Sequence, residues 1–195
     1  MAAGLAHAAG LGIDEVGLEI PADDTDFAAF LTEHGFQPQD ATIIECWIDA
    51  DRRPAITEIA DGYTLLSRAE AIDRPHHNVR SGPEIEMRLQ QTSLYRADLD
   101  LVVYSDTADV AAYGLFWFDP VSQTGQVEPM RTNDDHQRRG LARHVLTAGV
   151  DRLAAAGATR IKICYEDDNP ASGPLYRDVG FEPFRSTVEM SGPTG

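Results

Sequence analysis

The sequence predicts a mixed α/β fold with a mainly antiparallel sheet and flanking helices. Three observations in the second half of the chain lead to this class. Residues 99–104 and 110–118 are rich in β-branched and aromatic residues and are separated by a polar turn, which is typical of a hairpin. Residues 137–156 carry apolar side chains at helical spacing. Residues 159–165 then alternate between apolar and polar, as a half-buried strand does.

The strands before the long helix are expected to form an antiparallel meander. Residues 125–131 supply its third strand, and residues 63–67 supply the first strand of the same domain. Between residues 70 and 95 the pattern favours one or two helices, interrupted at Pro75 and at Gly82-Pro83. We therefore expect helices on at least one side of the meander.

The long helix is predicted from an apolar stripe whose members are three or four residues apart: Leu141, Val145, Leu146, Gly149, Val150 and Leu153. Gly157 fits a helix C-cap. A second helix over 174–179 closes at Gly180, and a last strand starts at Phe181. This strand–helix–strand order implies at least one parallel strand pair, joined by a right-handed crossover.

The first fifty residues look like a second copy of the C-terminal part. The similar segments are 5–10 and 153–157, 15–20 and 161–165, and His34-Gly-Phe-Gln-Pro38 and Val179-Gly-Phe-Glu-Pro183. Such self-similarity, with only a small insertion or deletion, indicates a duplicated unit. We therefore expect a partial, degenerate repeat over 1–50 that is the back half of a copy, a linker over 51–61 and a complete domain over 62–195.

The charge of the chain limits its partners. It has 32 acidic and 16 basic residues, hence a formal net charge of −16. Such a surface repels nucleic acid and anionic lipid and attracts a cationic acceptor. Lys162 is its one lysine, so nearly all positive charge is arginine, whose planar fork suits phosphate oxygens. We therefore expect no nucleic acid as a partner. We expect no membrane either, because in addition no stretch resembles a membrane span.

Cysteines and histidines give no sign of a disulfide framework or a metal site. Cys46 and Cys164 each lie in an apolar, strand-like run, where a buried, reduced thiol is the default. We therefore expect a cytoplasmic protein. His76 and His77 are adjacent and point in different directions, and no Cys or His lies at ligand spacing, so a loop pair is expected and no metal.

The sharpest motif is Gln137-Arg-Arg-Gly-Leu-Ala142, between a strand and the long helix. A glycine and a small residue at a helix start let a bound group approach the backbone, whose first amides have no internal partner. Those amides and the helix dipole make an anion site. Arg138, Arg139 and Arg143 add the positive charge that the chain otherwise lacks. The motif is neither the P-loop nor the dinucleotide glycine fingerprint.

Pro129 lies in the strand that precedes this motif. It cannot donate a ladder hydrogen bond, so it predicts a bulge or a splayed strand end. Splaying from residues 159–165 would leave a cleft beside the helix N-terminus. Downstream, Asn169 begins the next helical segment, and Tyr176 precedes Gly180-Phe181.

With these motifs in this order, the sequence resembles the GNAT superfamily of N-acetyltransferases over residues 60–190. Members share a Q/R-x-x-G-x-G/A pyrophosphate loop after a fourth strand, which is Gln137 to Ala142 here. They also share an Asn-to-Tyr segment ending in Gly-Phe, which is Asn169 to Phe181 here. The repeat at the N-terminus looks like two-domain GNAT proteins with one degenerate copy. The resemblance implies a GNAT-type sheet preceded by a partial second unit.

Carried over by position, the resemblance implies acetyl-coenzyme A as the acyl donor. Main-chain groups of Met130 and Thr132 would bind the pantetheine and polarise the acetyl carbonyl, and Asn169 would contact the pantetheine arm. Tyr176 would protonate the departing thiolate, since a phenol keeps its proton at neutral pH. The cofactor-binding set that follows is Met130, Arg131, Thr132, Gln137, Arg138, Arg139, Gly140, Leu141, Ala142, Arg143 and Asn169.

The sequence motifs specify the general acid and the general base less closely than they specify the cofactor site. Gly173 and Pro174 interrupt a helical turn that is usually unbroken, so the helix is expected to begin at Pro174, with Tyr176 in its first turn and displaced. An aromatic side chain packed on the sheet is the alternative role of Tyr176. The base that deprotonates the amine is expected to be Glu128; Glu86 and a water chain are alternatives.

The sequence thus predicts transfer of an acetyl group from acetyl-coenzyme A to a primary amine of a small molecule or peptide, by direct attack in a ternary complex. Two alternatives are a catalytically inactive acyl-coenzyme A-binding module and a non-catalytic interaction protein. A homodimer is expected, because a truncated copy would leave an exposed sheet edge and apolar surface. Nothing in residues 70–95, where the acceptor pocket normally lies, selects an acceptor.

Overall fold

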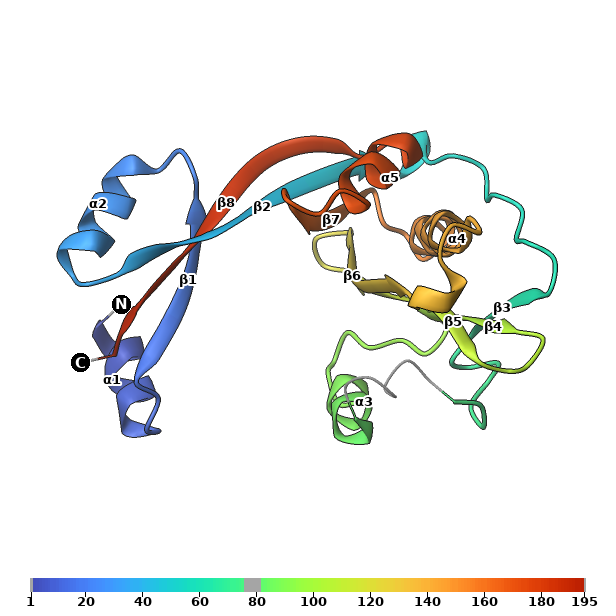
Figure 1. Cartoon of the computed structure of the whole chain (residues 1–195), viewed down its shortest axis with the longest axis horizontal. Coiled ribbons are helices and arrows are strands. Elements are labelled where there is room, and N and C mark those ends of the chain that lie inside the picture. Colours follow the sequence, from blue (N-terminus) through green and yellow to red (C-terminus); the bar gives the residue numbers. More distant parts are fainter. Residues whose placement is uncertain (1, 76–81, 195) are drawn as a thin grey trace. The chain divides into compact units, whose positions relative to one another are not determined.

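The computed structural model describes residues 2–75 and 82–194 (Figure 1). In this part of the chain eight strands follow the order β1-β8-β2-β7-β6-β5-β4-β3; the pairs β1–β8, β3–β4, β4–β5 and β5–β6 are antiparallel, and β6–β7 is parallel. Helices flank the strands. The predicted mixed α/β class with a mainly antiparallel sheet is confirmed.

The chain divides into two compact units. Unit 1 holds the residues up to Cys46, Cys164–Gly173 and the residues from Pro183 onward. Unit 2 holds Trp47–Ile163 and Pro174–Glu182. Each unit therefore contains segments from both ends of the sequence.

Unit 2 is built on an antiparallel meander, as the sequence predicts. Leu66 of β3 pairs with Val102 of β4, Val102 pairs with Tyr113 of β5, and Tyr113 pairs with Arg131 of β6. Strand β6 then runs parallel to β7. The bounds are β3 Tyr63–Ser67, β4 Asp100–Ser105, β5 Val110–Asp119, β6 Thr124–Thr132 and β7 Arg160–Glu166, each within one residue of the predicted strands.

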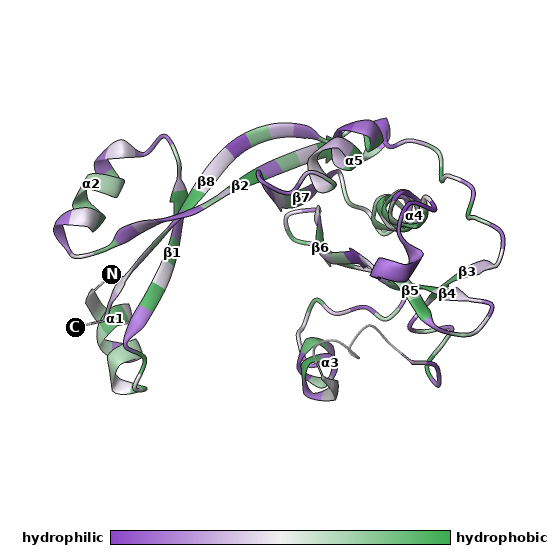
Figure 2. Cartoon of the chain, viewed as in Figure 1, coloured by the Kyte–Doolittle hydropathy of each residue, from purple (hydrophilic) through white to green (hydrophobic). Residues whose placement is uncertain are grey.

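Helix α4 (Leu141–Ala155) covers one face of this meander. Leu141, Val145 and Leu153 are buried, and much of the helix carries the colour of hydrophobic residues in Figure 2. Gly149 lets the helix approach the ring of Phe116 so closely that a Cβ there would overlap it. The predicted apolar stripe is thus the face that packs on β5.

The start of α4 differs from the predicted helix over 137–156. Residues 137–140 form a loop, because Arg138 (φ 62°) and Gly140 (φ 77°) have left-handed backbone conformations that a right-handed helix excludes. The end of the helix is as predicted. Gly157 has φ 109° and donates its N–H to Ala154 O.

Between β3 and β4 the structure describes one helix, α3 (Pro83–Gln90), inside the segment where one or two were predicted. In Figure 1, α3 and α4 lie on opposite sides of the strands of unit 2. The predicted loop pair His76-His77 lies outside the described residues. Within the segment 51–61, Thr57 is fixed to α4: its N–H donates to Thr147 Oγ1 (3.2 Å), and its carbonyl lies 2.5 Å from His144 Nδ1.

Helix α5 (Ser172–Val179) begins two residues before the predicted start at Pro174. The carboxamide Oδ1 of Asn169 accepts the N–H groups of Ala171 (3.1 Å) and Ser172 (3.3 Å), which starts the helix early. Pro174 is then the third helical residue, where a missing N–H costs no helix hydrogen bond. Tyr176 consequently lies beyond the first turn, against the prediction.

Unit 1 has its own small core. Strand β1 (Glu15–Pro21) pairs with β8 (Glu182–Pro193) over seven residue pairs, from Glu15 with Pro193 to Pro21 with Thr187. Its buried side chains come from β1, α2 (Thr25–Glu33), the start of β2 (Gln37–Asp49) and β8; they are Ile20, Leu31, Phe36 and Met190, with Leu5 of α1 (Ala2–Gly10) packed against them.

The two cysteines differ in exposure. Both are free, but Cys46 is buried and Cys164 is half-buried. Cys164 shares a strand face with Lys162, whereas the neighbouring Ile161 and Ile163 point to the buried face. The predicted burial is therefore confirmed for Cys46 and wrong for Cys164.

The elements of the first fifty residues recur near the C-terminus at a constant spacing of 145 residues (176 minus 31 for Leu31 and Tyr176). Strands β1 (Glu15–Pro21) and β7 (Arg160–Glu166) correspond residue for residue. Strands β2 and β8 start at corresponding positions, and α1 and α4 end at corresponding positions. The helix end that matches Gly157 is Gly12, which also has positive φ, and not Gly10 as the sequence alignment suggested.

The ends of the corresponding helices have the same hydrogen bonds. Asp24 accepts the N–H of Phe27 at the start of α2, as Asn169 accepts that of Ser172 at the start of α5. Each helix closes at a glycine of positive φ, followed by a buried phenylalanine. Phe36 donates its N–H to Leu31 O, and Phe181 donates its N–H to Tyr176 O, both at 3.0 Å. No insertion or deletion separates these segments.

Candidate functional site

The Gln137–Ala142 segment forms a loop that ends on an uncapped helix N-terminus. Gly140 occupies the N-cap of α4 in a left-handed conformation and has no side chain to accept the first helical N–H groups. The first intrahelical bond runs from His144 N to Gly140 O, so the amides of Leu141, Ala142 and Arg143 have no acceptor inside the helix. Space is open around the Cα of Gly140. These donors, together with the helix dipole, suit an anion such as a pyrophosphate.

The arginines of this loop are in different states. Arg138 and Arg139 are exposed and make no ion pair within the described chain. Arg143 is paired with Asp178 of α5, with 2.7 Å between Nη2 and Oδ2. Two unpaired guanidinium groups therefore lie at the helix N-terminus of a chain that is strongly acidic elsewhere.

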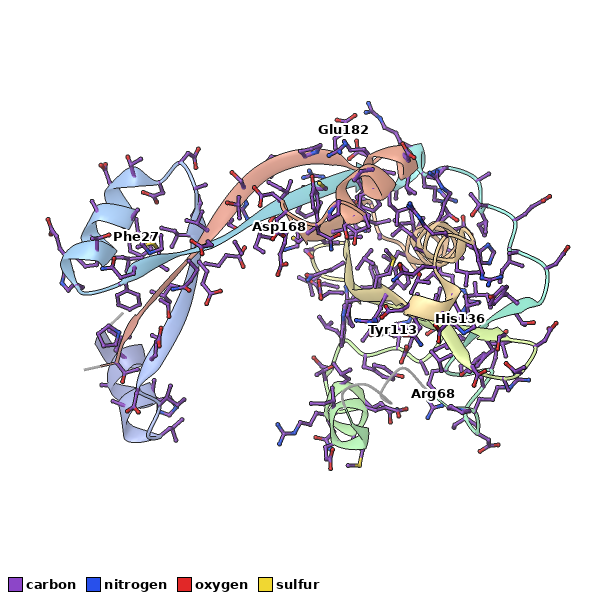
Figure 3. All side chains as sticks on the ribbon, in the orientation of Figure 1. Phe27, Arg68, Tyr113, His136, Asp168 and Glu182 are labelled. Atoms are coloured by element: carbon purple, nitrogen blue, oxygen red, sulfur yellow. The ribbon has the colours of Figure 1, made fainter. Side chains whose placement is uncertain are left out.

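The loop is held from the side of β6. Gln137 donates through Nε2 to Asp134 Oδ1 (3.2 Å), and Arg131 lies 3.4 Å from the same oxygen. His136, labelled in Figure 3, ends the short 3₁₀ helix η3 (Asp134–His136), and its Nδ1 lies 3.0 Å from the hydroxyl of Tyr63 on β3. The approach to the anion loop is thus anchored to two strands of unit 2.

Strand β6 contains the bulge that Pro129 predicted. Phe116 pairs with Val127 and Gly114 pairs with Met130, so Glu128 and Pro129 together face Leu115 alone. The Glu128–Pro129 peptide bond is cis. The parallel register with β7 runs from Thr124 to Val127 and so ends where the bulge begins.

Beyond the bulge lie the β6 residues that were predicted to meet the pantetheine. Met130 and Thr132 pair with Gly114 and Ala112 of β5. Thr132 Oγ1 and Arg131 Nε are buried and have no hydrogen-bond partner in the described structure. An unsatisfied buried polar atom is uncommon and costs free energy, so both atoms fit a place where a bound polar group completes the hydrogen bonding.

Glu128 sits at the bulge with a perturbed carboxyl group. The residue keeps exposed surface, yet the protein around its carboxyl raises the pKa of Glu128 above the ordinary value for a glutamate, because desolvation disfavours the charged form. The positive charge of Lys162 offsets part of this rise. A carboxylate with a raised pKa is a stronger proton acceptor than a fully solvated one.

Glu86, the alternative base, is engaged in a structural pair. Its Oε1 lies 2.7 Å from Arg68 Nη2 and accepts from Gln90 Nε2 at 2.9 Å. Both charged side chains are largely buried. Protonating Glu86 would therefore break a buried ion pair, which opposes a role in proton transfer.

Tyr176 is a buried side chain of α5 in unit 2, 6% exposed. Its ring packs against that of Phe181, with 6.3 Å between centroids. Its predicted alternative role, packing on the sheet, stays a prediction. Asn169 belongs to unit 1, where its carboxamide is used to cap α5.

Sequence reasoning missed two aromatic side chains on the face of the sheet opposite α4. Trp117 donates its indole Nε1–H to the carbonyl of Glu128 at 2.6 Å, and the ring of Tyr95 meets the indole edge-on, with 6.5 Å between centroids. Tyr95 in turn donates its hydroxyl to Asp100 Oδ2 at 2.8 Å. No sequence signal linked Trp117 to Glu128.

Within residues 2–75 and 82–194, no group of three His, Cys, Asp or Glu side chains could hold a metal ion. None of the helices in these ranges has the length and apolarity needed to cross a lipid bilayer.

Comparison with known proteins assigns a family to this arrangement. The sequence profile of the Acetyltransferase (GNAT) family matches residues 62–181. Two curated relatives are mycothiol acetyltransferases. That of Clavibacter michiganensis is 29% identical over 122 residues, which cover 63% of this chain and 39% of the relative. That of Saccharopolyspora erythraea is 25% identical over 199 residues, which cover 89% of this chain and 65% of the relative. The chain thus spans less than two thirds of the length of either.

Solved structures support the same fold. A GCN5-related N-acetyltransferase from Sphaerobacter thermophilus has a TM-score of 0.76 at 18% identity, covering 93% of this chain and 61% of that one. A tandem GNAT protein from the clavulanic acid biosynthesis pathway has a TM-score of 0.78 at 14% identity, covering 100% of this chain and 68% of that one. At such identities the likeness concerns the fold alone.

Proposed function

Because the chain belongs to the Acetyltransferase (GNAT) family, we propose that it transfers an acetyl group from acetyl-coenzyme A to a primary amine of a small molecule or peptide. The observation that carries the proposal is that α4 has an uncapped N-terminus, preceded in sequence by two arginines that make no ion pair with the described residues. This feature combines positive charge with free helix amides in an acidic chain, and it fits the pyrophosphate of coenzyme A.

Binding of acetyl-coenzyme A would use the loop and the end of β6. The amides of Gly140, Leu141 and Ala142 and the side chains of Arg138 and Arg139 hold the pyrophosphate. Gln137 supports the loop through Asp134, while Arg143 is paired with Asp178 beside it. The main chain of Met130, Arg131 and Thr132 receives the pantetheine and polarises the acetyl carbonyl. The contact of Asn169 with the pantetheine arm stays a prediction from the family resemblance.

The chemistry is direct attack in a ternary complex. The amine nitrogen forms a bond to the acetyl carbon while the carbon–sulfur bond breaks, giving an amide and coenzyme A thiolate. Glu128 accepts the proton that the amine loses; its raised pKa supports this choice over the paired Glu86. Tyr176 gives a proton to the departing thiolate; Glu128 then releases its proton to solvent, and Tyr176 takes one up.

The acceptor is proposed to reach the site as an ammonium ion, since the net charge of −16 attracts cations, and to lose one proton to solvent so that the neutral amine can attack. The acceptor used by mycothiol acetyltransferases is the first to test, because two curated relatives carry that name. An acyl-coenzyme A-binding module without turnover is the alternative, and it would bind the donor equally well.

The internal repeat is part of the proposal. The constant spacing and matching helix ends support a duplication, with a partial copy over 1–50, the segment 51–61 between copies and the acetyltransferase domain over 62–195. Leu31 at the position of Tyr176 supports a copy without catalysis. Strand β1 is an edge strand, which supports the proposed homodimer. We also propose a cytoplasmic location, where the free thiols Cys46 and Cys164 stay reduced.

The test is calorimetric titration with acetyl-coenzyme A of the wild type, Gly140→Glu and Gly140→Gln. Both variants share the backbone strain of a side chain at φ 77° and have nearly equal bulk, but only Glu adds a negative charge beside the phosphates. We expect wild-type binding, weaker binding by Gly140→Gln and none by Gly140→Glu. Equal binding by all three would place the donor elsewhere. Thiol release with a panel of amines then separates an enzyme from a binding module.

A further inference from the structure

The bulge in β6 interrupts its regular pairing with β5. In the register of β5 and β6, Glu128 and Pro129 share the place of one residue, and proline offers no N–H. The carbonyl of Glu128 accepts a hydrogen bond from the indole Nε1–H of Trp117, 2.6 Å away. This side chain therefore fixes the backbone at the residue that carries the proposed base.

The indole is itself held from a second direction. Tyr95 lies between α3 and β4, and its ring meets the indole edge-on at an interplanar angle of 69°. Its hydroxyl donates to Asp100 Oδ2, and Asp100 is 1% exposed. Burial and the neighbouring Asp100 carboxylate raise the pKa of Tyr95, so the phenol stays protonated as a donor. Trp117 is thus clamped between a buried carboxylate and the bulge.

These side chains lie on the face of the sheet opposite α4. Gly114 and Phe116 contact α4, so Tyr113 and Trp117, which alternate with them along β5, point the other way. Trp117 pairs with Gln126 of β6, and Gln126 pairs with Lys162 of β7, the lysine whose charge acts on Glu128. One face therefore gathers the clamp, the base and its one cationic neighbour.

We propose that Trp117 is a positioning residue of acetyl transfer, whose indole N–H fixes the bulged backbone at Glu128 and so orients that carboxylate towards the acceptor amine. The inference rests on the proposed function with Glu128 as the base. Trp117 touches neither donor nor acceptor in this scheme and acts through Glu128. Replacing the indole with an aromatic ring that has no N–H leaves the packing and releases the carbonyl.

The test compares Trp117→Phe with Trp47→Phe, the other tryptophan, whose ring lies under Arg160 at 4.5 Å. We expect Trp117→Phe to lower kcat about tenfold, with the KM for acetyl-coenzyme A nearly unchanged, because a misplaced catalytic group slows the reaction step and not donor binding. The acid limb of its pH profile should also move to lower pH, since a loosened bulge admits water to the Glu128 carboxyl. Trp47→Phe should keep the wild-type kcat and profile.

A double-mutant cycle tests whether the effect passes through Glu128. If it does, Trp117→Phe added to Glu128→Gln should change the residual kcat less than about twofold, because the group it positions is already gone. A full tenfold loss in that background would overturn the inference. So would a Trp117→Phe enzyme with wild-type kcat beside an active wild type. A wild type that acetylates no amine would instead refute the proposed function.

If the Trp117→Phe chain fails to fold, a measurement that does not depend on turnover still tests the inference. In Trp47→Phe the remaining indole N–H gives a single signal in a ¹H–¹⁵N spectrum. We expect this N–H to exchange slowly with solvent and its signal to shift when acetyl-coenzyme A is added. Fast exchange would mean that the bond to Glu128 is absent, and would overturn the inference.

Discussion

Arg143 and Asp178 join the first turn of α4 to α5 through an ion pair of 2.7 Å, and both side chains are partly exposed. The pair draws one guanidinium away from the phosphate loop. Asp178→Asn should cost at most about 1 kcal/mol of unfolding free energy. It should also tighten binding of acetyl-coenzyme A, because Arg143 becomes free to face the pyrophosphate.

Calorimetry and thermal unfolding check this prediction. The matched control is Asp151→Asn, which breaks the 2.8 Å pair with Arg53 away from the loop and should leave donor affinity unchanged. Weaker binding by Asp178→Asn than by the control would show that the pair holds the site in shape.

Arg138 adds a positive charge at the anion loop but lowers the free energy of unfolding. It has φ 62°, a conformation that costs a residue with a Cβ about 1 kcal/mol. Arg138→Gly should therefore raise the free energy of unfolding while weakening acetyl-coenzyme A binding. Arg139→Gly, at a neighbour without positive φ, should weaken binding with no gain in stability. Denaturant titration measures the stability of the two variants, and calorimetry measures their binding of acetyl-coenzyme A. Equal stabilities would show that Arg138 is not strained.

Tyr176 should matter to catalysis through its hydroxyl. Tyr176→Phe keeps the ring that packs on Phe181 and removes only the hydroxyl. Loss of the proton donor should lower kcat about 100-fold. Steady-state thiol release measures it. An unchanged kcat would leave the residue with the packing role alone.

The rate should fall on the acid side as Glu128 is protonated. Only the carboxylate accepts a proton, and burial raises the pKa of Glu128 in the folded chain, so the acid limb of kcat/KM should lie above the ordinary glutamate range. Lys162→Met removes the cation that lowers this pKa and should move the limb to higher pH. Glu128→Gln should abolish it. A profile that is unchanged in Glu128→Gln would assign the limb to another group.

Gly149 and Gly4 occupy corresponding positions of the proposed repeat but differ in surroundings. A Cβ on Gly149 would overlap the ring of Phe116, whereas nothing lies within 4 Å of a Cβ on Gly4. Gly149→Ala should therefore destabilise the chain by about 1–3 kcal/mol through overpacking. Gly4→Ala should be neutral or stabilising, since alanine favours the helix. Thermal unfolding of both variants checks the contrast, and equal effects would contradict the close packing of α4 on β5.

Regular periodicity accounts for what the sequence could predict. The strands of the meander and the end of α4 follow from alternation, helical spacing and Gly157, all of which are local signals. The starts of α4 and α5 were predicted wrongly, because they depend on the left-handed Arg138 and on capping by Asn169, neither of which has a periodic signature.

The site was only partly readable for the same reason. The anion loop has a compact sequence motif, and Pro129 predicted the bulge because proline has no N–H. The clamp on Glu128 joins Tyr95, Trp117 and Asp100 from separate elements and becomes visible only when the strands are in register. The ion pair of Glu86 with Arg68 likewise could not be predicted from the sequence, because it forms only in the folded chain.

The pairing of β1 with β8 has a consequence for the order of events during synthesis. Strand β1 leaves the ribosome before the strand that completes it, Glu182–Pro193, is translated. Until then β1 lacks the strand it pairs with, and Leu31 and Phe36 lack Met190 beside them. Strand β1 must therefore remain unpaired, or be shielded by a chaperone, while the residues between β1 and β8 are made.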